Sequence, residues 1–404
     1  MAEAGTDPDA SNATFFADAA FSANPQPTYR EMRSGCPVMR TDGPAGVILT
    51  RYEDVLFALR HPETFSSNME AVEIGNQRPL IPLQLDPPEQ TRYRRLLDPQ
   101  FSSQKMRVLE PEVRRMVNGL IDSFIDNDEC EFNEAFAIPL PCTVFLRLMG
   151  LPIKDLDLLL ELKDRIIRPD TTDVAEATRI RSETGDRIYA YFEGAIDARR
   201  SERGSDLVSY LLDADVDGDR LQRTEILDIC YLFLLGGLDT VTASLGCAVA
   251  YLARNPEQRR KLVADPSLIA SAVEELLRWE TPVMGIARVA LQNVTIGDTE
   301  IRAGERVTLL IGSANTDEEE FADAEQVDVA RMPNRHLAFG GGPHRCLGSH
   351  LARLELRVSL EELHRRIPDY AVSPGEEPGY AVGIREVKYL PLVFGSRLPA
   401  GEVR

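Results

Sequence analysis

Apolar positions recur at helical spacing along most of the chain, and this periodicity predicts a mainly helical fold. Polar residues or Pro, Asp and Gly, which end helices, separate these stretches. The predicted helices include residues 105–125, 156–167, 178–203 and 222–254. Shorter runs rich in β-branched residues predict strands at 287–291, 294–296, 306–311 and 387–394, and residues 46–60 predict a strand followed by a short helix. We therefore expect a mainly α fold with small β sheets.

No linker rich in Pro, Gly or Ser divides the 404 residues, so we expect a single domain over residues 16–404. Residues 1–15 lack an apolar centre, which predicts a disordered N-terminus that is neither a signal peptide nor an anchor. The stretch 226–253 is long enough to cross a bilayer, but it contains two acidic residues and a Gly–Gly pair near its middle. A buried helix without membrane anchoring is the better interpretation.

The charge and the cysteines limit the class of protein. With 65 acidic against 45 basic side chains, the formal net charge is -20. This charge disfavours nucleic acid and anionic membranes as partners. The six cysteines are scattered without a paired framework in a long chain that shows no export signal, which predicts a reducing, cytoplasmic location.

The strongest chemical signal is a glycine-rich loop that ends at Cys346 and precedes an amphipathic run at 349–367. A thiolate at the start of a helix is stabilised by the positive end of the helix dipole and is a good iron ligand. Three glycines at 340–342 allow the backbone to pass close to a flat macrocycle, and Phe339 can shield the sulfur from water. Zinc is disfavoured because no CxxC or HxxxH pair accompanies this cysteine. A catalytic cysteine nucleophile stays open, because its base could lie anywhere in the sequence.

Polar residues interrupt the long apolar helix at its middle. Gly236 and Gly237 each cost about 1 kcal/mol relative to Ala, so something is expected to pack against bare backbone there. The Thr240 hydroxyl can bond back to the carbonyl of Gly236, loosening the helix and opening a groove for dioxygen and water. Asp239 adds an acid beside it. An ordinary helix–helix crossing with a polar edge is an equally good interpretation of these residues on their own.

Three further arginine positions can be interpreted either as surface charges or as parts of a site. Glu275 and Arg278 lie three residues apart on one helix face, which in isolation indicates a solvated surface pair. Gln90 and Arg94 lie four apart after two prolines that start a helix, and a bidentate arginine suits a carboxylate of a cofactor. Arg288 in isolation is most simply a surface charge.

The segment from His336 to Arg353 resembles the heme-binding signature of soluble bacterial cytochromes P-450. The resemblance extends over about residues 25–395 and implies the fold of that family. It implies that Cys346 is the axial ligand of heme b. Further cofactor-binding residues implied by the resemblance are Gln90, Arg94, Arg288, Phe339, His344 and Gly348.

The resemblance also assigns roles elsewhere. It implies that Asp239 and Thr240 are the acid and the alcohol of an oxygen-activating helix, and that Glu275 and Arg278 are a buried structural pair. The family usually adds a third member from the loop before the cysteine, where this chain has Gln326. The implied substrate pocket consists of Leu235, Gly236, Val283, Met284, Ile286, Val382 and Ile384.

The implied activity is a monooxygenase that inserts one atom of dioxygen into an apolar small molecule. Electrons are expected from a ferredoxin and its NAD(P)H-dependent reductase, docking on a basic patch of Arg92, Arg95, Arg345 and Arg353. A heme-thiolate sensor without turnover and a peroxide-driven enzyme are the alternatives. The adjacent Asp239 and Thr240 argue against both, because a proton relay is superfluous to a sensor and replaceable in a peroxide user.

Overall fold

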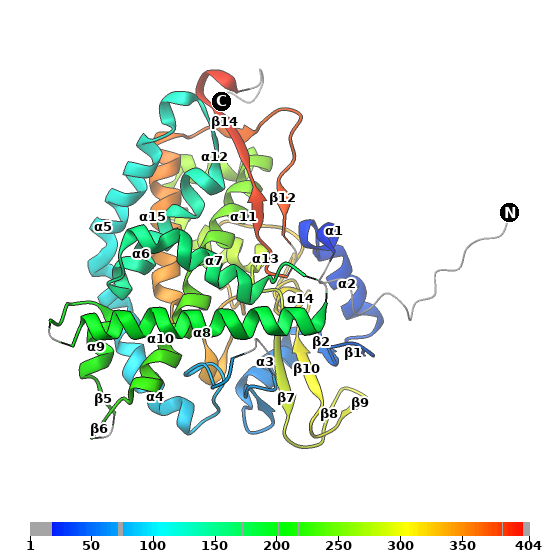
Figure 1. The fold of residues 1–404 in the computed structure, drawn as a ribbon. Helices are drawn as coiled ribbons and strands as arrows, with labels where there is room; N and C mark the ends of the chain where they lie inside the picture. Colours follow the sequence, from blue (N-terminus) through cyan, green and yellow to red (C-terminus); the bar gives the residue numbers. More distant parts are fainter. Residues whose placement is uncertain are drawn as a thin grey trace.

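The computed structural model describes residues 18–71, 76–171, 173–200, 202–216, 218–381 and 383–398. The predicted disordered segment 1–15 lies outside these residues. Helices form the larger part of the molecule, the largest sheet lies at the lower right of the view, and smaller groups of strands lie at other edges (Figure 1). This arrangement confirms the predicted mainly α fold with small sheets.

The helices follow one another along most of the chain. In chain order they are α1 (Ala19–Ala23), α2 (Gln26–Gly35), α3 (Tyr52–Arg60), α4 (Glu89–Leu97), α5 (Ser103–Asp122), α6 (Pro139–Met149), α7 (Leu156–Ile167), α8 (Val174–Ala198), α9 (Leu207–Asp213), α10 (Arg223–Gly237), α11 (Thr240–Arg254), α12 (Pro256–Ala264), α13 (Ile269–Glu280), α14 (Ile311–Ala314) and α15 (Ser349–Arg366). The predicted helix at 156–167 is therefore α7, and the predicted helix at 222–254 is divided into α10 and α11.

The main sheet has the strand order β1-β2-β10-β7-β3 and combines strands from both ends of the chain. Its strands are β1 (Val38–Arg40), β2 (Val47–Leu49), β3 (Phe65–Ser66), β7 (Ile286–Ala290) and β10 (Arg306–Leu309). Within this sheet only β2 and β10 pair in parallel, with Ile48 opposite Thr308. The predicted strand at 306–311 ends two residues early, because the chain turns into the buried helix α14.

The remaining strands form smaller units. They are β4 (Glu129–Glu131), β5 (Asp215–Val216), β6 (Asp219–Arg220), β8 (Val294–Ile296), β9 (Thr299–Ile301), β11 (Tyr370–Val372), β12 (Gly379–Tyr380), β13 (Val387–Tyr389) and β14 (Pro391–Phe394). The strand predicted at 294–296 is β8, and the run predicted at 387–394 is divided between β13 and β14.

The helices α10 and α11 form the centre of the helical body. Residues 223–254 are long and apolar enough to cross a membrane, but 67% of their most apolar window is buried inside the protein. Ten consecutive residues of α11, from Val241 to Ala250, are all buried. A helix covered by protein on most sides is apolar because it is in the core. This agrees with the expectation of a buried helix.

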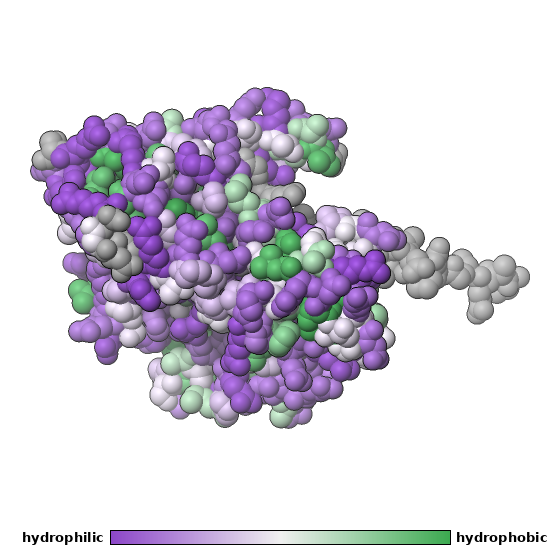
Figure 2. Space-filling model, turned by 90° about the horizontal axis from the view of Figure 1, so that it is seen from below, coloured by the Kyte–Doolittle hydropathy of each residue, from purple (hydrophilic) through white to green (hydrophobic). Residues whose placement is uncertain are grey.

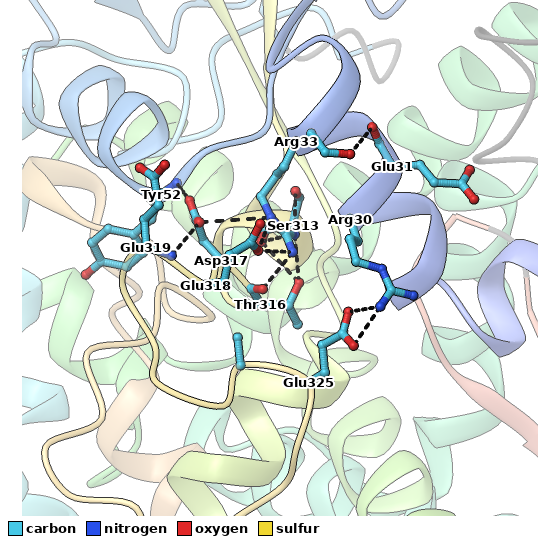
Figure 3. Close-up of polar contacts among 12 residues, drawn as sticks. Arg30, Glu31, Arg33, Tyr52, Ser313, Thr316, Asp317, Glu318, Glu319 and Glu325 are labelled. Atoms are coloured by element: carbon cyan, nitrogen blue, oxygen red, sulfur yellow. Dashed lines mark hydrogen bonds and ion pairs between the residues drawn. The ribbon is translucent and has the colours of Figure 1, made fainter.

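A buried arginine, Arg33, links the N-terminal helix α2 to the segment around α14 (Figure 3). The Arg33 side chain in α2 is 3% exposed and donates to the Ser313 carbonyl at 2.9 Å and the Thr316 carbonyl at 2.7 Å. Glu318 accepts from the same guanidinium at 2.9 Å, and Asp317 accepts from the Tyr52 backbone N–H at 2.8 Å. These bonds tie α2 and the start of α3 to the turn after α14. They matter for the site because α3 supports the Cys346 loop.

The face of the molecule in Figure 2 is mostly hydrophilic, with separated apolar patches. Such a surface agrees with the high content of charged residues, 27% of the chain.

Candidate active site

The loop before Cys346 is closed by its own backbone. The Cys346 N–H donates to the Phe339 carbonyl at 2.8 Å. Gly340 and Gly342 adopt φ angles of +66° and +61°, which side chains rarely allow. A Cβ on Gly342 would lie 2.2 Å from the Leu59 carbonyl oxygen of α3. Gly340 and Gly342 are therefore required by the turn, as expected for glycines that adopt conformations a Cβ would forbid, and the close packing of Gly342 on α3 is a further reason that the sequence pattern did not identify.

The Cys346 thiol lies just before α15, as predicted. Its residue is exposed by area, yet burial raises the pKa of the thiol. The Gly348 backbone N–H bonds to the sulfur, and Arg94, Arg353 and Arg345 act to lower this pKa. The residue is thus exposed although protein surrounds its sulfur closely. Metal binding would favour its thiolate form.

Two basic side chains beside the loop, buried Arg288 and partly buried His344, form no ion pair with the residues that the structure describes. Arg288 is 5% exposed and donates to the Ala287 carbonyl, and burial lowers its pKa to about 10. Burial, together with Arg288 and Arg94, lowers the pKa of His344 to about 4. The His344 Nε2 atom is buried and has no hydrogen-bond partner within the described ranges. Burying such groups is unfavourable unless an anion compensates them, so they fit the carboxylates of a ligand.

Helix α4 holds the same loop from the other side. Gln90 is buried and donates its amide N–H to the Pro343 carbonyl at 2.7 Å. Arg94 donates to the Arg345 carbonyl at 2.8 Å and pairs with Asp98 at 2.8 Å. Both side chains thus position the loop backbone.

The predicted break in the long helix is confirmed. Helix α10 ends at Gly237 and α11 begins at Thr240, whose hydroxyl donates to the Gly236 carbonyl at 3.2 Å. The two glycines differ, because a Cβ on Gly237 would lie 2.5 Å from the Phe145 ring whereas one on Gly236 would meet nothing within 4 Å. Gly236 is also exposed. Bare backbone therefore borders open space at the break, as expected for a groove.

Asp239 is more enclosed than the sequence indicated. It is 2% exposed and forms ion pairs with Lys163 of α7 and, at 3.2 Å, with Arg168. Burial acts to lower the pKa of Lys163, but the Asp239 carboxylate outweighs it and raises this pKa. Arg168 and Asp164 also line a surface hollow of about 560 Å³ between α7 and α8. Arg168 therefore connects the buried Asp239 to this hollow.

The Glu275–Arg278 pair is buried, and a third member joins it. Both side chains are 0% exposed and pair at 2.8 Å. Arg331 donates to the same Glu275 carboxylate at 3.0 Å. Gln326 contributes its backbone carbonyl, which accepts from Arg278 and Arg331. The surface interpretation is wrong, and the arginine expected at position 326 stands five residues later along the chain.

The sequence profile of the family described as Cytochrome P450 matches residues 144–366. A relative named Cytochrome P450 130 from Mycobacterium tuberculosis is 37% identical over 367 residues, which is 87% of this chain and 90% of the relative. The chain belongs to the cytochrome P450 family.

Other relatives and solved structures agree. A Steroid C26-monooxygenase from Mycobacterium tuberculosis is 34% identical and covers 98% of this chain and 99% of itself. The crystal structure of CYP109E1 from Bacillus megaterium in complex with testosterone has a TM-score of 0.88 at 29% identity, covering 94% of this chain and all of that one. The fold is that of the cytochromes P450, and the protein is a heme-dependent monooxygenase.

The residues present fit the heme of a cytochrome P450. Heme b has an iron that needs an axial ligand and two carboxylates that need cations. The accessible Cys346 sulfur offers the first, and the buried Arg288 guanidinium and His344 Nε2 offer the second.

The predicted pocket residues are only partly available to a substrate. Those at least partly exposed are Leu235, Gly236, Val283, Ile286 and Ile384. Met284 is 2% exposed and packs into a core cluster with Tyr29 and Leu310, and its place in the pocket stays a prediction. Val382 lies outside the described residues.

Proposed function

We propose that this cytochrome P450 holds heme through the Cys346 thiolate and oxidises an apolar small molecule with electrons from a ferredoxin. The observation that carries the ligand assignment is the accessible Cys346 sulfur beside two basic groups, Arg288 and His344, that pair with no carboxylate in the described part of the chain. One thiolate in the loop and two basic groups beside it match the one iron and the two carboxylates of heme.

When bound, thiolate-ligated heme activates dioxygen and inserts one oxygen atom into the substrate. The residues of the chain handle the protons that this chemistry consumes. The Thr240 hydroxyl donates to the Gly236 carbonyl, so its oxygen is free to accept a hydrogen bond from water in the open space beside Gly236. The protons come from solvent in the hollow between α7 and α8, which Arg168 lines, and Asp239 passes them inward from its position beside Arg168 and Lys163.

The proposed docking face for the ferredoxin includes Arg92, Arg95 and Arg345. Arg95 and Arg345 are exposed, and neither has an ion-pair partner in the part of the chain that the structure describes. Arg92 is 33% exposed and lies 3.6 Å from Glu225. Arg353 no longer belongs to this patch, because Glu274 binds it at 2.7 Å. Acidic ferredoxins are attracted to such a face in the cytoplasm, where the free cysteines stay reduced.

The proposed substrate is hydrocarbon-rich. Relatives at 34–36% identity are named Steroid C26-monooxygenase, Methyl-branched lipid omega-hydroxylase and Mycinamicin IV hydroxylase/epoxidase. The accessible side chains expected at the pocket, such as Leu235, Val283 and Ile384, are aliphatic and of medium size. We expect steroids and lipids to bind more tightly than polar compounds of equal size.

The test begins with the reduced carbon monoxide complex, whose red-shifted band reports thiolate ligation. Cys346→Ala is expected to abolish this band, whereas Cys36→Ala, which removes the other exposed cysteine, is expected to keep it. A Cys346→Ala protein that retains the band would refute the ligand assignment.

Turnover is tested with a reconstituted ferredoxin, its reductase and NAD(P)H, using a steroid and lipid panel. The proposal expects oxygenated product that depends on the ferredoxin. Product formed with hydrogen peroxide and not with ferredoxin would identify a peroxide-driven enzyme, and binding without product would identify a sensor.

A further inference from the structure

Helix α13 presents two consecutive carboxylates to the chain that leads to Cys346. Glu275 binds Arg278 and Arg331. Glu274 instead accepts from Arg353 Nε at 2.7 Å, from Arg353 Nη2 at 2.8 Å and from His336 Nε2 at 3.1 Å. Burial acts to raise the pKa of Glu274, but these hydrogen bonds outweigh it and lower the pKa to about 2. Glu274 is therefore an anion held by three donors.

The two partners of Glu274 are fixed in orientation. The His336 side chain is 2% exposed, and its Nδ1 accepts from the Ala338 backbone N–H at 3.2 Å. The proton must then be on Nε2, which donates to Glu274. The Arg353 guanidinium donates two N–H groups side by side to the Glu274 carboxylate, the geometry that holds an arginine plane rigidly.

Both partners also contact Phe339. The Arg353 guanidinium carbon lies 4.4 Å above the centre of the Phe339 ring, and the His336 ring centre lies 5.9 Å from it. The Phe339 carbonyl accepts the Cys346 N–H at 2.8 Å. A continuous series of contacts thus runs from Glu274 through Arg353 to Phe339 and to the backbone of Cys346.

We propose that Glu274 is a positioning residue that clamps Arg353 over the Phe339 ring and so controls the charge and the water around the Cys346 sulfur. The proposal rests on the proposed function, because it requires Cys346 to be the heme ligand. Arg353 contributes a positive charge near the sulfur, and Glu274 partly cancels it. The stacked guanidinium also restricts movement of the ring, which keeps water away from the thiolate.

The same helix offers a matched control. Arg357 lies one turn after Arg353 and pairs with Glu361 at 2.7 Å, with side chains 29% and 25% exposed. The Arg353 and Glu274 side chains are 28% and 26% exposed. The two pairs are alike in charge, distance and burial, but the Arg357 pair binds Glu110 of α5 and not Phe339. A general effect of losing an ion pair from α15 would appear equally at both positions.

The experiment compares Glu274→Gln, Arg353→Gln and Arg353→Lys with Glu361→Gln and Arg357→Gln in the heme-loaded enzyme. The measurements are the ferric–ferrous midpoint potential and the rate at which the red-shifted carbon monoxide band is lost on mild heating. Glu274→Gln is expected to raise the potential, because it leaves the Arg353 charge uncancelled. Arg353→Gln is expected to lower it, since the positive charge is removed.

Both variants are expected to lose the band roughly tenfold faster, because each loses hydrogen bonds between charged groups that stabilise the loaded protein. Arg353→Lys keeps the charge without the flat stacking group, so a nearly unchanged potential with faster band loss is expected. Both controls are expected to match the wild type.

Two results would overturn the proposal. One is that the Glu274 and Arg353 variants match the controls in both measurements, and the other is that Arg353→Lys loses the band no faster than wild type. Failure of the proposed function is distinguishable from either, because the wild-type protein would then lack a thiolate band or Cys346→Ala would retain it. A variant that does not load heme is replaced by Glu274→Asp, which keeps the charge but shortens its reach, and its expected faster band loss is judged against the same controls.

Discussion

Glu355 in α15 is a buried carboxyl group whose cost to stability depends on pH. The residue is 2% exposed, and its Oε2 atom has no hydrogen-bond partner among the residues that the structure describes. Burial raises its pKa from 4.5 to about 8. At neutral pH the folded protein therefore holds a neutral acid, whereas the unfolded chain carries a carboxylate.

The sign and size of the effect follow from these two pKa values. Below pH 4.5 the group is protonated in both states, and its contribution to stability is fully present. As the pH rises toward 8, only the unfolded chain ionises, and each pH unit favours unfolding by about 1.4 kcal/mol. Between pH 4.5 and 7 the loss reaches about 3 kcal/mol, an upper value for a site that water can enter.

Glu355→Gln keeps the shape of the neutral acid and removes its ionisation. We expect the variant to be close to wild type in free energy of unfolding at pH 5 and more stable by about 2–3 kcal/mol at pH 7.5. The assay is urea unfolding from pH 5 to 8, followed by far-ultraviolet circular dichroism at equal heme content. Glu361→Gln, which removes a partly exposed and ion-paired carboxylate from the same helix, serves as the control. Parallel pH curves for wild type and Glu355→Gln would refute this reasoning.

Three further predictions concern the relay, the docking face and the buried arginine. Thr240→Ala is expected to keep heme and the carbon monoxide band while diverting reducing equivalents to hydrogen peroxide. Asp239→Asn is expected to slow turnover, and equal product per NAD(P)H in wild type and both variants would contradict the relay. Arg345→Glu is expected to slow the first electron transfer from ferredoxin at low salt, with the difference shrinking as salt rises. Arg331→Gln is expected to destabilise the fold by about 3 kcal/mol, measured by urea unfolding, because it leaves part of the buried Glu275 carboxylate unpaired.

The sequence predicted those features whose cause is local. The break between α10 and α11 followed from two glycines and a threonine that bonds four residues back, and the structure contains that bond. The site of Cys346 before α15 followed from a glycine-rich loop and an amphipathic run. Local sequence sets these features because the residues that form them are neighbours along the chain.

Features that depend on distant contacts were not predictable. Arg331 reaches Glu275 across 56 residues, and nothing in the local spacing distinguishes it from Gln326 as the third member. Met284 is apolar like a pocket residue, but tertiary packing places it in a core cluster with Tyr29. Lys163 looked like any surface lysine in a helix, and only tertiary packing buries it against Asp239.

The two adjacent glycines of α10 have opposite consequences for redesign of the enzyme. Gly237 cannot accept even a methyl group without displacing the Phe145 ring, so any replacement there disturbs the packing of α6. Gly236 has room for a side chain, and alanine would strengthen the helix by about 1 kcal/mol. In the proposed site, retaining glycine at 236 thus leaves unoccupied volume in the substrate pocket. Lengthening this side chain stepwise from Gly to Ala to Val offers a direct way to change which substrates fit.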